Sequence, residues 1–269
     1  MKYKVKKIFL MGGVGNQLFQ LARAKQYFLD DSQSQIIKLT FGKSFIYKII
    51  NFTDHKIWID IDLLAKEMGI PVKEASFLDI IQLALIFFKK KISKNSNFDS
   101  PYFNEEGNIL HNRSNLDVGY FQNVKHVSKN AIKHVALSLI ENLKLENAES
   151  KSDFSVHLRG PSFIGARKEF GITLTKKDID LVISFSNENN LSYRVVTNDK
   201  SAINKTFGKI SSQNIYMGKN AKEDFIFLCL SKNLYITNST FAFWAAICGR
   251  ELQTKKILTC ESFEFNEFF

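Results

Sequence analysis

The sequence predicts an α/β protein in which short parallel strands form sheets and helices cover their faces. Strand and helix patterns alternate along the second half of the chain, and a glycine-rich turn joins the first strand pattern to the first helix pattern. Of the 269 residues, 45% are hydrophobic and only 3 are proline, which is typical of a globular protein with a large core. At this length we expect two domains, residues 1–150 and 151–269, with the boundary in the polar stretch 146–153.

The N-terminus predicts a strand, a tight turn and a helix. Residues 5–11 are a short strand candidate that ends in the apolar run 8–11, GGVGNQ follows at residues 12–17, and the next residues have helical periodicity. Gly13 and Gly15 would let a ligand approach the backbone, and the first helix amides favour a phosphate there. GGVGNQ is neither a dinucleotide fingerprint nor a P-loop, so a turn without a ligand remains an alternative. Asn16 at its mouth can both donate and accept hydrogen bonds.

Residues 30–110 show weaker patterns, and we expect most of this stretch to be irregular. Helical periodicity is present at residues 63–68 and 80–88, whereas residues 95–115 are polar and rich in turn residues. The apolar run 80–88 ends in three lysines, at 89–91. Such a segment fits a helix that touches the cytoplasmic face of a membrane, or a buried helix with a solvated basic end.

The second half has clearer periodicity. Residues 154–158 alternate between apolar and polar, which places His157 and Arg159 on one face of a strand. Thr175 is a helix cap with Asp178 in the first turn. Further strands are predicted at residues 193–197, 210–216, 234–237 and 256–259, with helices at residues 201–207, 221–231 and 240–248 between them.

Two further groups of residues could bind an anion at the carboxyl ends of these strands, where α/β sheets bind ligands. Arg159 could hold a phosphate bidentately, or it could be a surface arginine paired with a carboxylate. Ser239 and Thr240 begin an apolar helix, so their hydroxyls and the helix amides could form an anion site, or simply cap a buried helix. His157 fits a structural histidine as well as a catalytic one.

Four segments, in order along the chain, resemble the α-1,2-fucosyltransferases of glycosyltransferase family 11. The segment GGVGNQLFQLARA at residues 12–24 is similar to the opening signature of that family, and GYFQ at 119–122 resembles its Gly-Tyr-Trp-Gln segment. VHLRG at 156–160 resembles its His-x-Arg motif, and NSTFAFWAA at 238–246 its Asn-Ser-Ser-Phe-Ser-Trp-Trp block. Each match is weak by itself, but the ordered set over residues 12–246 is specific.

The resemblance implies a GT-B-like enzyme with two Rossmann-type domains facing each other across a cleft. It implies inverting transfer of L-fucose from GDP-β-L-fucose to the 2-hydroxyl of a terminal galactose, without a cofactor or a metal. Residues 1–150 would form the acceptor-side domain and residues 151–269 the GDP-sugar-binding domain. The site residues it implies fall into catalytic residues, Arg159, Asn16 and His157, and donor-binding residues, Gly13, Gly15, Arg159, Asn198, Asp199, Ser239 and Thr240.

The acceptor implied by the family is a galactose-terminated bacterial surface glycan of the O-antigen type, carried on a polyprenyl-diphosphate lipid. Transfer of another GDP-deoxyhexose, such as colitose, is the nearest alternative. We expect a cytoplasmic protein, because no signal-peptide core follows the N-terminus and the three cysteines form no CxxC. A peripheral contact with the cytoplasmic face of the inner membrane is compatible with this expectation. The net charge of +10 favours anionic partners, but no nucleic-acid-binding module is recognisable.

One departure from the family pattern bears on catalysis. The family continues its His-x-Arg motif with Arg-Gly-Asp-Tyr, whereas Arg159 is followed here by GPSF at residues 160–163. The second arginine and the aspartate are therefore absent. Glu169 or Asp224 could substitute for that acid, and a catalytically impaired, sugar-binding relative is a further alternative. The five histidines have no metal-ligand spacing.

Overall fold

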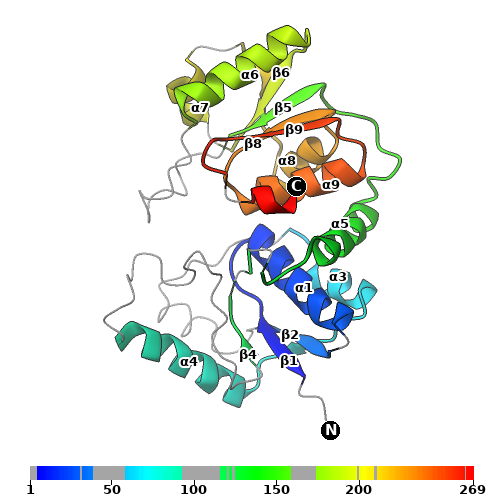
Figure 1. The fold of residues 1–269 in the computed structure, drawn as a ribbon, viewed down its shortest axis with the longest axis vertical. Helices are drawn as coiled ribbons and strands as arrows, with labels where there is room; N and C mark the ends of the chain where they lie inside the picture. Colours follow the sequence, from blue (N-terminus) through cyan, green and yellow to red (C-terminus); the bar gives the residue numbers. More distant parts are fainter. Residues whose placement is uncertain are drawn as a thin grey trace. The chain divides into compact units, whose positions relative to one another are not determined.

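The computed structural model describes residues 5–30, 32–38, 58–92, 116–119, 121–122, 125–158, 174–198, 200–208, 211–263 and 265–269. The described part is an α/β protein with parallel sheets (Figure 1). The chain divides into two compact units, residues 1–138 with Phe268 and residues 139–267 with Phe269. The division falls within helix α5 (Lys129–Leu143). The boundary expected after residue 150 lies in the loop between α5 and the next strand.

The sheet of the N-terminal unit has four strands in the order β3-β2-β1-β4, and every pair is parallel. Ile8 of β1 lies opposite Ile36 on one side and Asp117 on the other. The strands are β1 (Lys6–Phe9), β2 (Ser34–Lys38), β3 (Val72–Glu74) and β4 (Leu116–Asp117).

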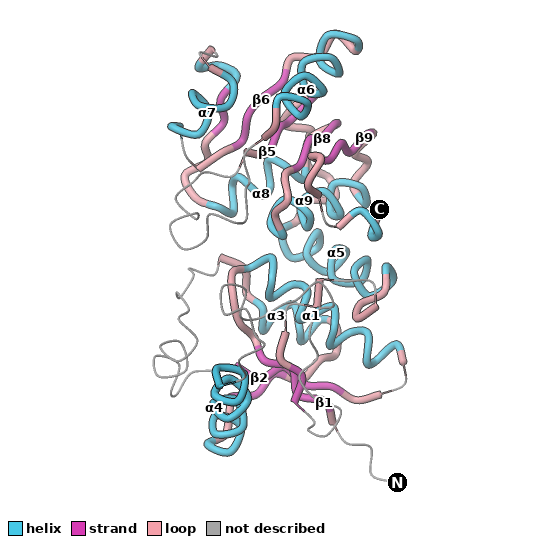
Figure 2. The backbone as a smooth tube through the Cα atoms, turned by 60° about the vertical axis from the view of Figure 1, so that its left-hand side comes forward, coloured by secondary structure: helices cyan, strands magenta, loops and turns pink. Residues whose placement is uncertain are grey.

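Helices cover both faces of this sheet. The helices are α1 (Val14–Leu29), α3 (Ile61–Glu67) and α4 (Phe77–Ile92). Alternate side chains of a strand point to opposite faces, and β1 shows this directly. Lys6 lies over the ring of Tyr27 on α1, whereas Lys7 forms a 2.6 Å ion pair with Asp79 on α4. The two helices therefore lie on opposite faces, as the backbone traces in Figure 2 also show.

The C-terminal unit has a five-stranded parallel sheet in the order β7-β6-β5-β8-β9. Its strands are β5 (Phe154–His157), β6 (Tyr193–Val196), β7 (Ile215–Tyr216), β8 (Asn233–Ile236) and β9 (Lys256–Thr259). Its helices are α6 (Lys176–Glu188), α7 (Lys200–Phe207), α8 (Ala221–Cys229) and α9 (Thr240–Glu251). Short 3₁₀ turns occur at η2 (Ser212–Asn214) and η3 (Asn266–Phe268).

The core of the C-terminal unit is centred on β8 and α9. Every residue of β8 is buried, as expected for a central parallel strand covered on both faces. Phe243 and Trp244 of α9 are fully buried and pack edge to face, with ring centroids 5.5 Å apart. Tyr235 of β8 is also fully buried, and its hydroxyl donates a 2.7 Å hydrogen bond to Asp178 at the start of α6.

The predicted strands of the second half are confirmed to within one residue at β5, β6, β8 and β9. The strand predicted at residues 210–216 is shorter over its described part, residues 211–216, where Ile215–Tyr216 alone pairs with β6. The helical segments predicted at residues 63–68 and 80–88 are confirmed as α3 and as a longer α4. The expectation that most of the remaining stretch is irregular is wrong where β2 and β3 are present. The turn-rich stretch 95–115 lies outside the described residues.

Candidate functional site

The N-terminal sheet has a topological switch point between β1 and β4. From β1 the chain runs outward to β2 and β3, and it returns to the other side of β1 to form β4. In open parallel sheets, ligands bind in the crevice beyond the carboxyl ends of the strands at such a point. The turn at residues 12–17 follows β1, and the GYFQ segment at 119–122 follows β4. Two of the four motifs therefore meet at one edge.

The glycine turn is held rigid by its own backbone and by a glutamine. Gly12 has a φ of +87°, a left-handed conformation that side chains disfavour. Gly13 is the N-cap residue of α1, and its carbonyl accepts hydrogen bonds from the amides of Asn16 (3.0 Å) and Gln17 (3.1 Å). The Gln17 side chain donates to the carbonyl of Gly12 at 2.9 Å. Gly15 is buried in the first turn of α1.

Two further hydrogen bonds tie the turn to the segment after β4. Gln20 is fully buried; its amide oxygen accepts from the Met11 amide, and its amide nitrogen donates to the Gly119 carbonyl, both at 2.9 Å. Gln122 donates to the side-chain oxygen of half-buried Asn16 at 2.9 Å. The structure thus brings Asn16 and Gln122 together. Sequence reasoning missed Gln20, although a glutamine within the apolar face of the first helix was a visible signal.

A partly buried network of polar side chains on α1 and β4 contacts the segment that follows β4. Arg23 donates to the His126 carbonyl at 2.6 Å and to the Tyr27 hydroxyl at 2.7 Å, and its guanidinium lies over the ring of Phe121. The Tyr27 hydroxyl donates to Asp117, which also pairs with Arg23 at 3.4 Å. Burial, followed by the hydrogen bond and charge of Asp117, raises the pKa of Tyr27 far above its usual range, so Tyr27 stays a donor. Sequence reasoning did not predict this network.

The C-terminal sheet has its own switch point, between β5 and β8. β6 and β7 extend on one side of β5, and β8 and β9 on the other. At this edge Nδ1 of His157 lies 2.7 Å from the hydroxyl oxygen of Thr237, and both side chains are buried. The His157 ring also lies near Phe241 of α9, with centroids 5.9 Å apart. The third and fourth motifs therefore meet through the rings of His157 and Phe241, next to the hydrogen bond between His157 and Thr237.

The other predicted donor-binding residues of this unit follow strands of the same parallel sheet. Ser239 is the buried N-cap residue of α9, and half-buried Thr240 is its first residue. Asn198 is exposed and comes just after β6. Arg159 and Asp199 lie outside the described residues. Arg159 comes two residues after the end of β5, and thus beyond the strand end at which His157 meets Thr237.

Of the two acids considered as catalytic substitutes, one can be placed. Glu169 lies outside the described residues. Asp224 is half-buried in the first turn of α8, and its carboxylate accepts a 2.7 Å hydrogen bond from the Gly218 amide. Burial raises the pKa of Asp224, and this hydrogen bond opposes the rise. Asp224 therefore holds the loop that follows β7.

Within the described residues, no three His, Cys, Asp or Glu side chains are grouped so that they could hold a metal ion. Among the described helices, none has the length and apolar character needed to cross a membrane.

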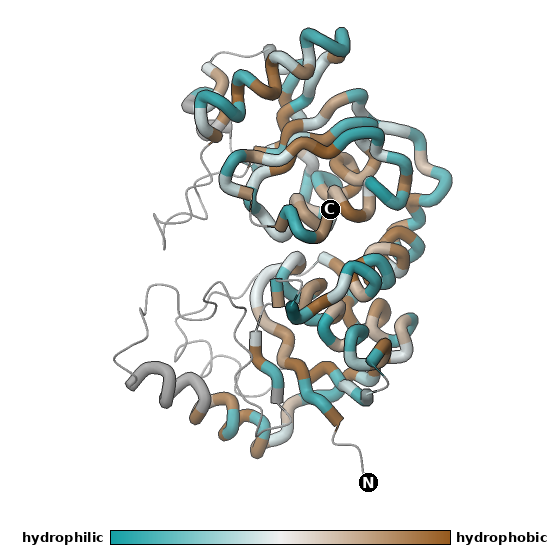
Figure 3. The backbone as a smooth tube through the Cα atoms, in the orientation of Figure 1, coloured by the Kyte–Doolittle hydropathy of each residue, from teal (hydrophilic) through white to brown (hydrophobic). Residues whose placement is uncertain are grey.

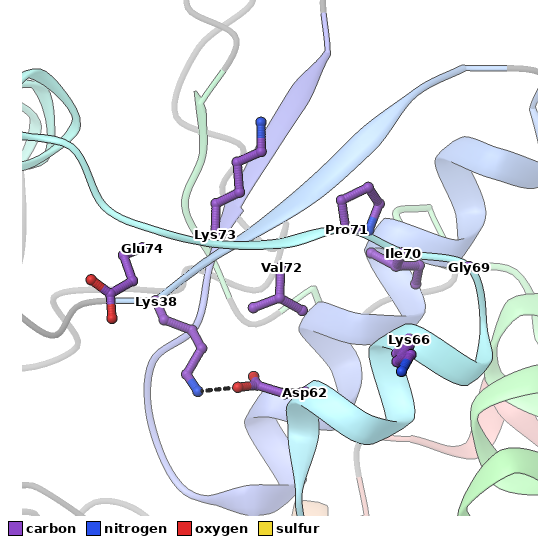
Figure 4. Close-up of a pocket in the computed structure, with 9 residues that line it drawn as sticks. All are labelled: Lys38, Asp62, Lys66, Gly69, Ile70, Pro71, Val72, Lys73 and Glu74. Atoms are coloured by element: carbon purple, nitrogen blue, oxygen red, sulfur yellow. Dashed lines mark hydrogen bonds and ion pairs between the residues drawn. The ribbon is translucent and has the colours of Figure 1, made fainter.

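A surface cavity of about 600 Å³ lies beside β3 and α3 of the N-terminal unit (Figure 4). It is lined by Lys38, Asp62 and residues 66 and 69–74, and Lys38 forms a 2.7 Å ion pair with Asp62 across it. None of the predicted site residues lines this cavity. It lies on the β3 side of the sheet, whereas the first two motifs meet between β1 and β4.

Comparisons with known proteins give little guidance. No protein-family profile matches the chain, and no curated protein matches it. Among solved structures, a crystal structure of POFUT1 in complex with GDP aligns with 97% of this chain and 100% of its own, at 10% sequence identity and a TM-score of 0.36.

Proposed function

We propose that the chain is a glycosyltransferase that moves L-fucose from GDP-fucose to the 2-hydroxyl of a terminal galactose. The observation that carries the proposal is the convergence of the motifs. Four segments that resemble one fucosyltransferase family are spread over residues 12–246, and they meet in pairs at the two topological switch points. If the similarity of the four segments to the family were due to chance, there would be no reason for them to lie at the edges where parallel sheets bind ligands.

The residues at these edges have the chemistry that the reaction requires. Cleavage of the donor bond places negative charge on the departing GDP, so preorganised donors around the diphosphate stabilise the transition state. We assign this role to Arg159, to the hydroxyls of Ser239 and Thr240, and to the first amides of α9. Gly13, Gly15 and Asn16 would bind the donor β-phosphate or the acceptor sugar, and Asn198 or Asp199 the nucleoside.

His157 takes a more limited part in this proposal. Its Nδ1 and the Thr237 hydroxyl form a buried hydrogen bond that fixes the ring between β5 and β8. This hydrogen bond ties the end of β5, which precedes Arg159 in the sequence, to the residue that follows β8. We therefore assign His157 to the proposed catalytic site at the carboxyl ends of β5 and β8. Its hydrogen bond to Thr237 determines the orientation of its ring.

The proposed partners are GDP-fucose and a galactose-terminated glycan on a polyprenyl-diphosphate carrier, at the cytoplasmic face of the membrane. No metal or other cofactor takes part in the proposed reaction. A second candidate, a sugar-binding relative with impaired catalysis, is favoured by one observation: GPSF follows Arg159 where the family has a second arginine and an aspartate.

One assay tests the proposal and separates the candidates. GDP release from GDP-fucose is measured with and without galactosides, and the product is analysed for a new fucosyl linkage. Galactoside-dependent GDP release with fucose on the 2-hydroxyl supports the proposal. Binding of GDP-fucose without acceptor-dependent release favours the impaired relative, and turnover of only another GDP-deoxyhexose shifts the donor assignment.

A further inference from the structure

We propose that α4 is an amphipathic docking helix that binds the surface of an anionic membrane. The observation behind this proposal is a row of exposed apolar side chains on the helix. Phe77 is 67% exposed, Leu78 69%, Leu85 52% and Ile81 39%. Phe77, Ile81 and Leu85 are spaced four residues apart, so they line one face of the helix, and Leu78 lies beside them.

This face points away from the sheet that α4 covers. Asp79, Ile80 and Leu83 occupy the opposite side of the helix and are buried. Asp79 anchors that side, because it forms a 2.6 Å ion pair with Lys7 of β1. Its carboxylate also accepts a 3.0 Å hydrogen bond from the Ser76 amide, while the Ser76 hydroxyl accepts a 3.2 Å bond from the Asp79 amide. The orientation of the helix is therefore fixed, and the apolar row is its outward face.

The exposed apolar side chains of α4 are neighbours on one face of a single helix. Among the described residues, the two most exposed large hydrophobic side chains are Phe77 and Leu78, which are neighbours on α4. Figure 3 shows brown, hydrophobic positions recurring along the coloured part of this helix. Single exposed apolar residues are common on proteins, but a contiguous set marks an interaction surface.

Charge selects a membrane as the occupant of this surface. The last turn of α4 contains three consecutive lysines, at positions 89–91, and the whole chain carries a net charge of +10. In sequence, an apolar row followed by a basic cluster is typical of segments that bind anionic lipid surfaces, because acyl chains accommodate apolar side chains and anionic headgroups attract positive charge. With 16 residues, α4 is too short to span the roughly 30 Å hydrocarbon layer. It therefore lies in the interface.

The inference deepens the proposed function, which places the protein at a membrane face, by naming the surface that binds there. Its test is independent of catalysis, since binding is measured without turnover. The full-length protein is mixed with vesicles of phosphatidylcholine, alone or with phosphatidylglycerol, and the bound fraction is measured by sedimentation at low and high ionic strength. We expect binding to the anionic vesicles, with weaker binding as salt is added.

Matched variants identify the surface. Phe77→Ser with Leu85→Ser should weaken binding roughly ten-fold or more for each residue, whereas Leu181→Ser with Ile183→Ser, which changes two exposed apolar residues of α6, should leave it unchanged. Replacing the lysines at 89–91 by glutamine should weaken binding roughly five-fold for each charge. Glutamine at exposed Lys176, Lys222 and Lys255 is the charge-matched control.

Circular dichroism and melting verify that each variant is folded, and a third variant, Leu78→Ser, covers the case in which the double variant does not fold. Three results would overturn the proposal. The first is that the protein does not bind anionic vesicles. The second is that the α6 variant loses as much vesicle binding as the α4 variant. The third is that vesicles are not bound and the α4 variants abolish a concentration-dependent dimer. The last result would identify a second copy of the chain as the occupant.

Discussion

An arginine beyond the carboxyl end of a parallel strand can stabilise charge as it develops on a departing diphosphate, and this makes Arg159 the first residue to change. Arg159→Lys keeps the charge but loses the planar fork of donors. Losing donors aimed at developing charge costs roughly 10²–10³ in turnover at comparable sites. We expect a fall in kcat of that size, a smaller change in the KM for GDP-fucose, and little change in Tm.

The control for this change is Arg194→Lys. Arg194 is an exposed arginine of β6 whose guanidinium lies 5.9 Å from the ring centroid of Phe227. The Arg194→Lys variant should keep normal kcat and KM. A loss of activity in Arg159→Lys alone would then be due to the position of Arg159 and not to the loss of any arginine. Near-normal kcat for Arg159→Lys would show that this side chain does not stabilise the leaving group.

Asn16 and Gln122 form the second residue-scale test, because their 2.9 Å hydrogen bond links two motifs. If Asn16 contacts substrate and Gln122 orients it, Asn16→Ala lowers kcat strongly and Gln122→Ala lowers it less. The double variant should then be no slower than Asn16→Ala. Rates and melting curves of all three proteins are measured. Additive losses would mean that the two side chains act separately, and unchanged rates would reduce the turn to a structural role.

Among the elements, α6 depends most on one ionised side chain. Asp178 closes the capping box with Thr175 and also accepts hydrogen bonds from Tyr235 and from the Glu261 amide. Burial alone would raise the pKa of Asp178, but these hydrogen bonds together outweigh it and hold the pKa below its ordinary value. The folded state therefore favours the carboxylate, and Asp178→Asn should lower the free energy of unfolding by about 1–3 kcal/mol.

The sign of this pKa shift determines its pH dependence. Since the folded-state pKa is depressed, the stabilisation is fully present above about pH 4, the ordinary value for Asp, and is lost as the pH falls through the folded-state pKa. The difference in Tm between the wild type and Asp178→Asn should thus be constant near neutrality and shrink below about pH 4. Asp180→Asn, an exposed site on the same helix, should show no such difference. A pH-independent difference would argue against ionisation as its source.

The elements that sequence patterns predicted well are those with a clear local period. β5, β8 and α9 have apolar residues where a strand or a helix requires them, and they lie close to their predicted positions. β2 and β3 were missed because they are short and owe their existence to pairing with β1 and with each other. α5 had an available signal: Ile132, Val135, Ala136 and Leu139 recur at helical spacing and are all buried.

At the scale of the whole molecule, sheet topology explains why distant motifs meet. Residues 12–17 and 119–122 are adjacent because β4 pairs with β1, and His157 reaches Thr237 because β8 pairs with β5. Sequence patterns nominated candidate site residues such as Asn16 and His157, and their roles stay predictions. The sequence could not predict the partners of these residues, such as Gln122 for Asn16 or Thr237 for His157, because strand order is set by long-range pairing and not by local pattern.

The last prediction concerns the charge balance of the whole reaction. The proposed site meets the diphosphate with an arginine, two hydroxyls and helix amides, all of which are positive or donating without a bound cation. Turnover of GDP-fucose should therefore persist in excess EDTA, and Mn²⁺ should not increase it appreciably. Initial rates are measured in EDTA, after removal of EDTA, and with Mn²⁺ added back. If EDTA abolishes turnover and Mn²⁺ restores it, a cation supplies the charge that we assign to Arg159, and the fall in kcat expected for Arg159→Lys loses its physical basis.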